Sequence, residues 1–238
     1  MKRYIRTAVT NVSDEDIYSR RELASSTANV YLLDQLSEDI DPEIRCLVAA
    51  NPNTPTDILI KLASDSMPRV PEFLFMREAP LPLEVQKAIA YNCPGLRKLL
   101  LEYENVDTEI IEILSNDELY YIREKAATKS RLSDESKIRL SNDSDRYVRY
   151  ALSKNSKLPL EAIRNLSKDP YDYTRLTIAG RKDVPADILD DLSFDEFPNV
   201  RLTVAFNQQT PISTLERMLN DSDEEVRHFA KNNISSRI

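Results

Sequence analysis

Residues 44–65 read IRCLVAANPNTPTDILIKLASD, and residues 200–221 read VRLTVAFNQQTPISTLERMLND. Both stretches open on an aliphatic residue and an arginine, carry an asparagine six positions after that arginine, and continue through Thr-Pro into a Leu-containing segment. Their starting positions differ by six periods of 26 residues. Repetition at a fixed period is the sequence signature of a repeat protein, in which neighbouring units stack on one another.

The period runs along almost the whole chain as two columns of charged residues. The arginine column consists of Arg45, Arg97, Arg123, Arg149, Arg175, Arg201 and Arg227. The aspartate column, six residues before the arginine position, consists of Asp39, Asp65, Asp117, Asp143, Asp169, Asp195 and Asp221. Pro71 and Tyr91 stand where one arginine and one aspartate are missing. We expect a single domain over residues 1–238, with a degenerate N-terminal unit and cap at 1–38, eight repeats at 39–233 and a C-terminal tail at 234–238.

Apolar residues recur at helical spacing in both halves of each unit. Val200 and Val204 fall on one face of a first helix, and Ile188, Leu189 and Leu192 define a second helix in the preceding unit. A two-helix unit this short cannot bury its apolar faces alone, so the units must stack into a continuous core. The sequence therefore predicts an all-α superhelix, a solenoid of eight two-helix repeats.

Prolines and polar residues mark the expected helix ends. Pro42 and Pro198 are placed to open first helices, where a missing N–H costs nothing. Thr54 and Thr210 are expected to cap the second helices. An asparagine column is expected to close the first helix in left-handed backbone geometry, and consists of Asn51, Asn155, Asn207 and Asn233.

Composition agrees with helices and narrows the class of protein. The chain has 2 glycines in 238 residues and 30% charged residues, which favours helices over sheets. Its net charge of −8 argues against a general nucleic-acid binder, which needs a basic surface. No segment has the apolar length of a signal peptide or a membrane span. We expect a cytoplasmic protein that does not enter the membrane.

The run at residues 44–65 resembles the repeat of the leucine-rich repeat variant family, VRxxVAxNPxTPxxxLxxLAxD, and the resemblance extends over residues 39–233. It implies a right-handed solenoid of alternating helices, some of them 3₁₀. The founding type of that family carries an N-terminal cysteine cluster for an iron–sulfur centre. This sequence has only Cys46 and Cys93, far apart, so no cofactor is expected. The Asp-to-Arg spacing also resembles the polar ladder of HEAT repeats.

The arginine column has two possible roles. A row of guanidinium groups can grip a phosphate backbone or an acidic peptide. Each arginine is also matched in number by an aspartate at constant offset, so the two columns can satisfy each other and cap the turns between helices. We favour the structural ladder.

Tyrosines form a third column, two residues before successive arginines. Tyr121, Tyr147 and Tyr173 are expected to lie along one edge of the solenoid, with Tyr120, Tyr150 and Tyr171 close by. Tyrosine combines a large contact area with a polar tip and is enriched in binding hot spots. Partial burial against the neighbouring helix is the alternative. Of these residues, Tyr121, Tyr147, Tyr173 and Tyr150 are the candidate partner-binding residues.

Two further features of the sequence are possible sites. Residues 71–94 break the repeat with a bulky run containing Phe73, Phe75 and Met76, which is either an apolar patch or a repacked core. For catalysis the chain offers one histidine, His228, without a nearby cysteine or a nucleophile motif, and acidic pairs without metal-ligand spacing. We expect neither a catalytic nor a metal site.

The sequence thus favours a non-enzymatic scaffold that binds a protein or a peptide on the curved solenoid surface. The alternative is a nucleic-acid-binding, HEAT-like protein with an arginine- and tyrosine-lined surface. That alternative gains support if Arg123, Arg149, Arg175 and Arg201 point to solvent unpaired beside the tyrosines.

Overall fold

The computed structural model describes residue 12 and residues 15–237. These residues form seventeen α-helices and no strand, so the expected all-α repeat fold is confirmed. Internal contacts divide the chain into two compact units, Met1–Ile110 and Ile111–Ile238. The expectation of one domain over residues 1–238 stays a prediction, and the two units are described separately.

The first unit begins with a regular helix pair on each side of residue 40 and then becomes irregular. Its helices are α1 (Ile17–Ser26), α2 (Val30–Leu36), α3 (Pro42–Ala50), α4 (Thr56–Ala63), α5 (Arg69–Glu72), η2 (Phe73–Met76), α6 (Leu83–Asn92), η3 (Pro94–Leu96) and α7 (Arg97–Glu102). The 3₁₀ helices η2 and η3 lie where the sequence repeat is weakest. Helix α8 (Thr108–Leu114) spans the boundary between the units.

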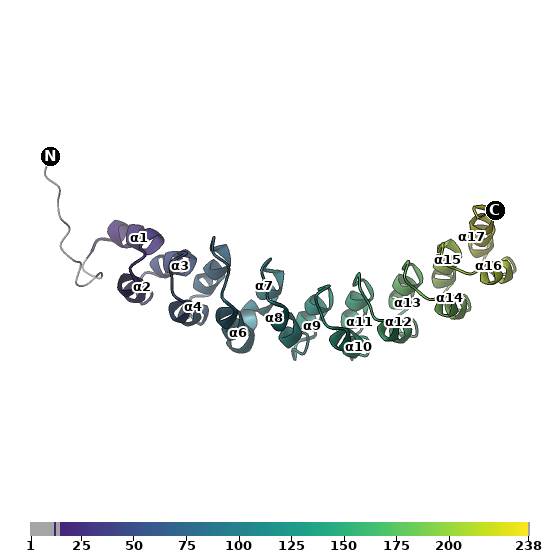
Figure 1. Cartoon of the computed structure of the whole chain (residues 1–238), viewed down its shortest axis with the longest axis horizontal. Helices are drawn as coiled ribbons and strands as arrows, with labels where there is room; N and C mark the ends of the chain where they lie inside the picture. The colour runs from purple at the N-terminus through teal and green to yellow at the C-terminus, as the bar shows by residue number, and fades with distance from the viewer. Residues whose placement is uncertain (1–11, 13–14, 238) are drawn as a thin grey trace. The chain divides into compact units, whose positions relative to one another are not determined.

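The second unit is regular. Its helices are α9 (Tyr120–Ala127), α10 (Asp134–Leu140), α11 (Arg146–Ser153), α12 (Leu160–Leu166), α13 (Asp172–Ala179), α14 (Ala186–Leu192), α15 (Pro198–Phe206), α16 (Ile212–Met218) and α17 (Glu224–Ser235). Within this unit the odd-numbered helices form one layer and the even-numbered helices the other, and each odd helix packs on the next odd helix (Figure 1). Helix α17 continues to Ser235, two residues into the expected tail.

Periodic apolar residues fill the core of both units. The position three residues after the arginine is fully buried throughout, at Val48, Leu74, Leu100, Ala126, Leu152, Ile178, Val204 and Ala230. A second buried column consists of Leu36, Leu62, Leu114, Leu140, Leu166, Leu192 and Met218. Each helix therefore buries a side chain at the same position of its repeat. This allows successive units to stack with the same geometry.

The structure corrects two expectations about helix ends. Thr54 and Thr210 do not cap the second helices, because their hydroxyls donate at 2.6 Å to the Val48 and Val204 carbonyls at the ends of the first helices. The asparagine column does not adopt left-handed geometry: Asn207 has φ −67° and ψ 124°, and none of the described non-glycine residues has positive φ.

The asparagine side chains instead join neighbouring repeats. The Asn207 Nδ2 atom donates to the carbonyls of Ala179 and Arg181 at 2.6 and 2.8 Å, and its Oδ1 atom accepts from the Gln209 N–H at 2.8 Å. The same bonds to the preceding repeat are made by Asn51, Asn155 and Asn233. Carbonyls at a helix C-terminus lack partners within the helix, so this side chain satisfies them.

Candidate functional site

The arginine and aspartate columns form one continuous ladder in the second unit. The Nε and Nη2 atoms of Arg149 donate to the Asp169 carboxylate in the next repeat, at 2.6 and 3.2 Å. Its Nη1 atom donates to the carbonyl of Asp143 in its own repeat, at 2.7 Å. The same two-pronged bond to the following repeat joins Arg123 to Asp143, Arg175 to Asp195 and Arg201 to Asp221.

Each ladder carboxylate also receives a backbone N–H two residues later. Asp143 accepts from the Asp145 N–H at 2.9 Å, directly before helix α11. Burial alone would raise the pKa of the Asp143 carboxyl, but the hydrogen bonds from Arg123 and from this N–H outweigh it and hold the pKa below its ordinary value. The same balance lowers the pKa values of Asp195 and Asp221. These three ladder carboxylates are therefore fully charged at neutral pH.

A shorter ladder occurs in the first unit. Arg45 joins Asp65 through Nε and Nη2, at 2.7 and 3.0 Å, and donates to the Asp39 carbonyl. Asp39 in turn accepts from Arg20 at 2.9 Å. Arg20 does not follow the repeat period, because it stands 19 residues before its aspartate, whereas the other arginines of the ladder stand 20 before theirs. The next position in this unit is Pro71, where the arginine is missing.

Two column members make other bonds. Arg97 donates from Nε to the Ala90 carbonyl at 2.7 Å. Arg227 donates from Nη1 to the carbonyls of Asp221 and Ser222, at 2.7 and 3.0 Å. Asp117 accepts the Leu119 N–H on its carboxylate and the Arg123 Nη1 on its carbonyl. Every column position therefore has a structural bond in its own unit.

The ladder leaves little of the arginines for a ligand. The side chains of Arg123, Arg149, Arg175 and Arg201 are only 15, 14, 10 and 12% exposed. A guanidinium that forms a two-pronged bond to a carboxylate already uses the pair of N–H donors with which it would bind a phosphate. The condition for the nucleic-acid alternative, four unpaired arginines, is not met.

The second unit carries an aromatic surface at the N-terminal ends of α9, α11 and α13, which we call the tyrosine surface. It consists of Tyr120, Tyr121, Tyr147, Tyr150, Tyr171 and Tyr173. The candidate residues Tyr121, Tyr147 and Tyr173 are 44, 41 and 53% exposed, and the candidate Tyr150 is half-buried. Because α9, α11 and α13 pack side by side, these rings lie on consecutive repeats (Figure 1).

The rings contact one another through residues outside the Tyr121 column. Tyr120 meets Tyr121 edge-on at 5.9 Å between ring centroids and approaches Tyr147 at 6.4 Å. Tyr171 lies 5.3 Å from Tyr173 and 5.9 Å from Tyr150. These contacts form two groups of three tyrosines.

Arg146 joins the two groups. Its guanidinium carbon lies 4.8 Å from the Tyr147 ring centroid and 5.3 Å from the Tyr171 ring centroid. Its Nη2 atom donates to the Tyr147 hydroxyl at 2.9 Å. The Lys154 ammonium lies 3.9 Å from the Tyr150 ring centroid, so a second cation stands over this surface.

Sequence analysis did not single out Arg146 or Lys154. Arg146 occupies the position of Tyr120 in the preceding repeat and of Asp172 in the following one, so no column marks it. The available signal was an arginine directly before a tyrosine of the exposed column. The fixed period, which finds structural residues well, hides residues that occur in one repeat only.

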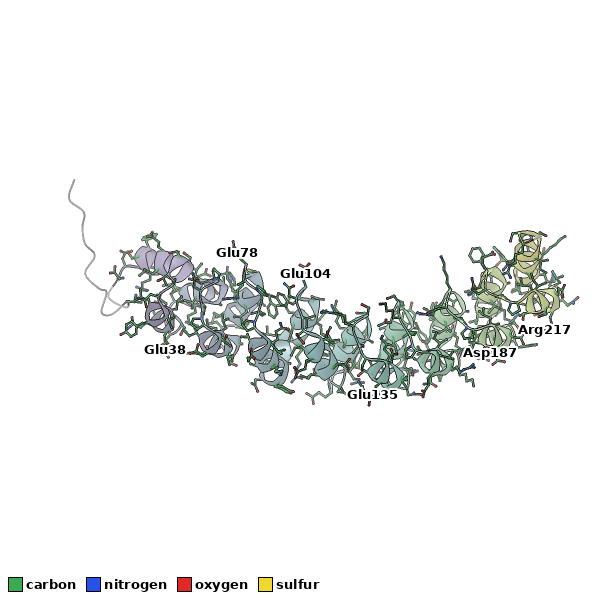
Figure 2. All side chains as sticks on the ribbon, in the orientation of Figure 1. Glu38, Glu78, Glu104, Glu135, Asp187 and Arg217 are labelled. Carbon is green, nitrogen blue, oxygen red and sulfur yellow. The ribbon has the colours of Figure 1, made fainter. Side chains whose placement is uncertain are left out.

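A pocket of about 490 Å³ lies in the irregular part of the first unit. Phe75 and Tyr103 line it with their rings 5.7 Å apart, and Glu78 and Glu104 stand beside it on the side of the unit opposite Glu38 (Figure 2). Met76 is 65% exposed and Leu74 is fully buried. The bulky run at residues 73–76 is therefore partly repacked core and partly surface.

The described residues show no other concentration of chemistry. Among residue 12 and residues 15–237, no three His, Cys, Asp or Glu side chains are grouped so as to hold a metal ion. Cys46 is buried and Cys93 half-buried, and both are free. His228 is exposed and hydrogen-bonds Asn232. Within the same residues, no helix is both long and apolar enough to cross a bilayer.

Comparison with solved structures identifies a protein of the same fold. The solved structure of a leucine-rich repeat variant, described as having a novel repetitive structural motif, matches with a TM-score of 0.67 and 24% identity, over 91% of this chain and 82% of that one. The chain has the leucine-rich repeat variant fold. The fold that the sequence resemblance implied is thereby confirmed.

The remaining comparisons add no functional information. An engineered protein matches over 91% of this chain and 72% of its own, with 14% identity and a TM-score of 0.38, a likeness too low to carry a conclusion. No family model and no curated protein sequence matches the chain. The function must therefore be argued from the surface of this molecule.

Proposed function

We propose that this protein is a non-enzymatic scaffold that binds a protein or a peptide through the tyrosine surface. The observation that carries the proposal is the contiguity of six tyrosines from three consecutive repeats, joined by ring contacts and by Arg146. Soluble monomeric proteins rarely expose a large contiguous patch of this kind, and such patches usually mark interaction sites. Tyrosine and arginine are also the residues most enriched in binding hot spots.

The architecture supports the same proposal. Repeat proteins present extended surfaces to which every repeat contributes equivalent positions. Here α9, α11 and α13 lie side by side. The ladder bonds of Arg123 and Arg149 join each of these repeats to the next and hold the helices in fixed relative positions. The rings are therefore pre-organised, which lowers the entropy cost of binding. That solenoids commonly act as scaffolds is fold-level analogy, so the proposal depends on the surface itself.

The test is site-specific photo-crosslinking combined with affinity capture. A photoreactive phenylalanine analogue placed at Tyr121 or Tyr173 should crosslink one partner from nuclease-treated lysate. The same partner, once purified, should bind wild type and lose affinity by about tenfold or more for the triple variant Tyr121→Ala, Tyr147→Ala, Tyr173→Ala. Circular dichroism and thermal unfolding must show that the variant is folded.

A matched control separates the surface from general tyrosine loss. Tyr18, Tyr31 and Tyr91 are exposed tyrosines in the first unit, at 79, 58 and 61%. Their triple alanine variant should bind the partner like wild type. Equal binding by both triple variants would refute the proposal, as would a partner that is captured only from lysate left untreated with nuclease.

A further inference from the structure

The two cations of the tyrosine surface, Arg146 and Lys154, form no ion pair among the residues that the structure describes. Two other surface arginines of this unit are paired at 2.7 Å, namely Arg164 with Asp187 and Arg217 with Asp190. The cations over the tyrosines are therefore available to a carboxylate from outside.

The acidic residues closest in sequence are already engaged. Asp145 accepts the Tyr147 N–H at 2.8 Å and so caps helix α11. Asp143 and Asp169 belong to the ladder and bond Arg123 and Arg149. Asp172 lies in the first turn of α13, between Tyr171 and Tyr173 in the sequence. Among the described residues, the Arg146 guanidinium thus has no hydrogen bond to a carboxylate, although the whole chain carries −8.

Arg146 is also held in a receptive geometry. The rings of Tyr147 and Tyr171 flank its guanidinium, and the Tyr147 hydroxyl takes one of its five N–H donors. The remaining donors can meet a carboxylate in the two-pronged geometry that arginine favours. A guanidinium already fixed by ring contacts loses less conformational entropy when it binds.

We infer that the tyrosine surface takes an acidic segment of a protein partner, with one carboxylate on Arg146 and another near Lys154. This inference rests on the proposed function and adds the chemistry of the partner. A single-stranded nucleic acid can also stack on tyrosines, but it needs a continuous positive groove along its backbone. Two cations with Asp172 between the rings do not make one, so the acidic peptide is favoured.

Selection from a displayed random-peptide library tests the inference without assuming a sequence. The baits are wild type, the double variant Arg146→Gln, Lys154→Gln, the triple variant Tyr121→Ala, Tyr147→Ala, Tyr173→Ala, and a control double variant Lys168→Gln, Lys182→Gln. The control changes net charge equally at two exposed lysines of the same unit that form no ion pair among the described residues. The winning peptide is then synthesised with Glu or Gln at its acidic positions for measurement by fluorescence anisotropy, beside a labelled oligouridine.

Wild type and control should enrich peptides rich in Asp and Glu, and the Arg146 and Lys154 variant should not. The Glu peptide should bind wild type about tenfold or more tightly than the Gln peptide. Arg146→Lys should recover only part of the affinity, since an ammonium lacks the two-pronged geometry. Non-acidic peptides that still require Tyr121, Tyr147 and Tyr173 would overturn the inference and leave the proposed function standing. Selection that is indifferent to the tyrosines, or tighter binding of oligouridine, would overturn both.

Discussion

The guanidinium of Arg149 donates to the carboxylate of Asp169, 20 residues ahead. To Asp143, six residues behind, it donates at the backbone carbonyl and not at the carboxylate. Each repeat is thereby tied to the next through side chains and to its own turn through backbone. In the second unit this produces an unbroken sequence of bonds from Arg123 to Arg227. The ladder joins successive repeats. Removing one of its side chains should therefore lower the stability of the stacked repeats and leave ligand recognition unchanged.

Breaking one rung should destabilise the second unit. Asp195 accepts from Arg175 at 2.6 and 2.9 Å and from the Phe197 N–H at 2.9 Å, and its side chain is only 6% exposed. Asp195→Asn removes the charge and leaves a buried guanidinium without its partner. We expect the free energy of unfolding in urea to fall by about 2–4 kcal/mol.

Asp187→Asn is the matched control for this rung. Asp187 pairs with Arg164 at 2.7 Å, but both side chains are about half exposed, and Asp187 is labelled at the surface of the unit in Figure 2. Solvent screens such a pair, so little change in stability is expected. If the two substitutions had equal effects, the ladder would contribute no more than an ordinary surface ion pair.

Acid should weaken the ladder in a defined range. The pKa values of Asp65, Asp143, Asp195 and Asp221 are lowered in the folded protein, where bonds to arginine outweigh burial. A lowered pKa means that the folded state binds fewer protons than the unfolded state. The resulting stability is present above the ordinary aspartate pKa of about 4 and is lost as pH falls through the lower folded values.

Urea unfolding measured from neutral pH down to acidic pH tests this expectation. The free energy of unfolding should decline steeply below about pH 4. The decline should be shallower for Asp195→Asn, which has one ladder carboxylate fewer. A slope that is identical in wild type and variant would show that Asp195 does not contribute to the acid sensitivity.

Periodicity made the fold predictable because stacking repeats the same contacts. A column that is apolar in every unit, such as the one containing Val48 and Val204, has to be core, and the structure buries it completely. Which aspartate an arginine bonds was not predictable, because positions six behind and 20 ahead recur with the same period. Chain geometry decides between them only after the helices have stacked.

The tyrosine surface was predictable only in part for a related reason. The exposed column Tyr121, Tyr147 and Tyr173 follows the period and could be read from the sequence. Contacts between its members run instead through Tyr120, Tyr171 and Arg146, and none of these residue types recurs at its position in the neighbouring repeats. Features that make one repeat differ from the next are invisible to a search for what repeats share.

The asparagine column offers a test of its corrected role. Asn207→Ala removes two bonds to the preceding repeat and one to the Gln209 N–H, all near 2.8 Å or shorter. We expect a loss of about 2 kcal/mol in the free energy of unfolding, because the backbone groups left behind are buried. Asn207→Gly distinguishes a role in left-handed backbone geometry from a role in bonding the preceding repeat. A left-handed site would tolerate glycine, whereas the observed extended geometry predicts a loss at least as large as that of alanine.

Asn199→Ala serves as the control for this substitution. Asn199 is exposed in the first turn of α15, and only its backbone carbonyl is used, by the Thr203 hydroxyl at 2.8 Å. Its replacement should leave stability nearly unchanged. A cost equal to that of Asn207→Ala would contradict the inter-repeat role.

Thr174 is the position where a substitution should stabilise the protein. It occupies the column filled by Ile122, Val148, Val200 and Val226, is fully buried, and its hydroxyl has no hydrogen-bond partner among the described residues. A buried, unpartnered hydroxyl costs about 1–3 kcal/mol relative to an apolar group of similar shape. Thr174→Val should therefore raise the free energy of unfolding by about 1 kcal/mol, measured in urea. The reverse change, Val148→Thr, should lower it by a similar amount. A destabilising Thr174→Val would mean that the hydroxyl donates a bond in solution, and the neighbouring turn of α13 would then have to supply the acceptor.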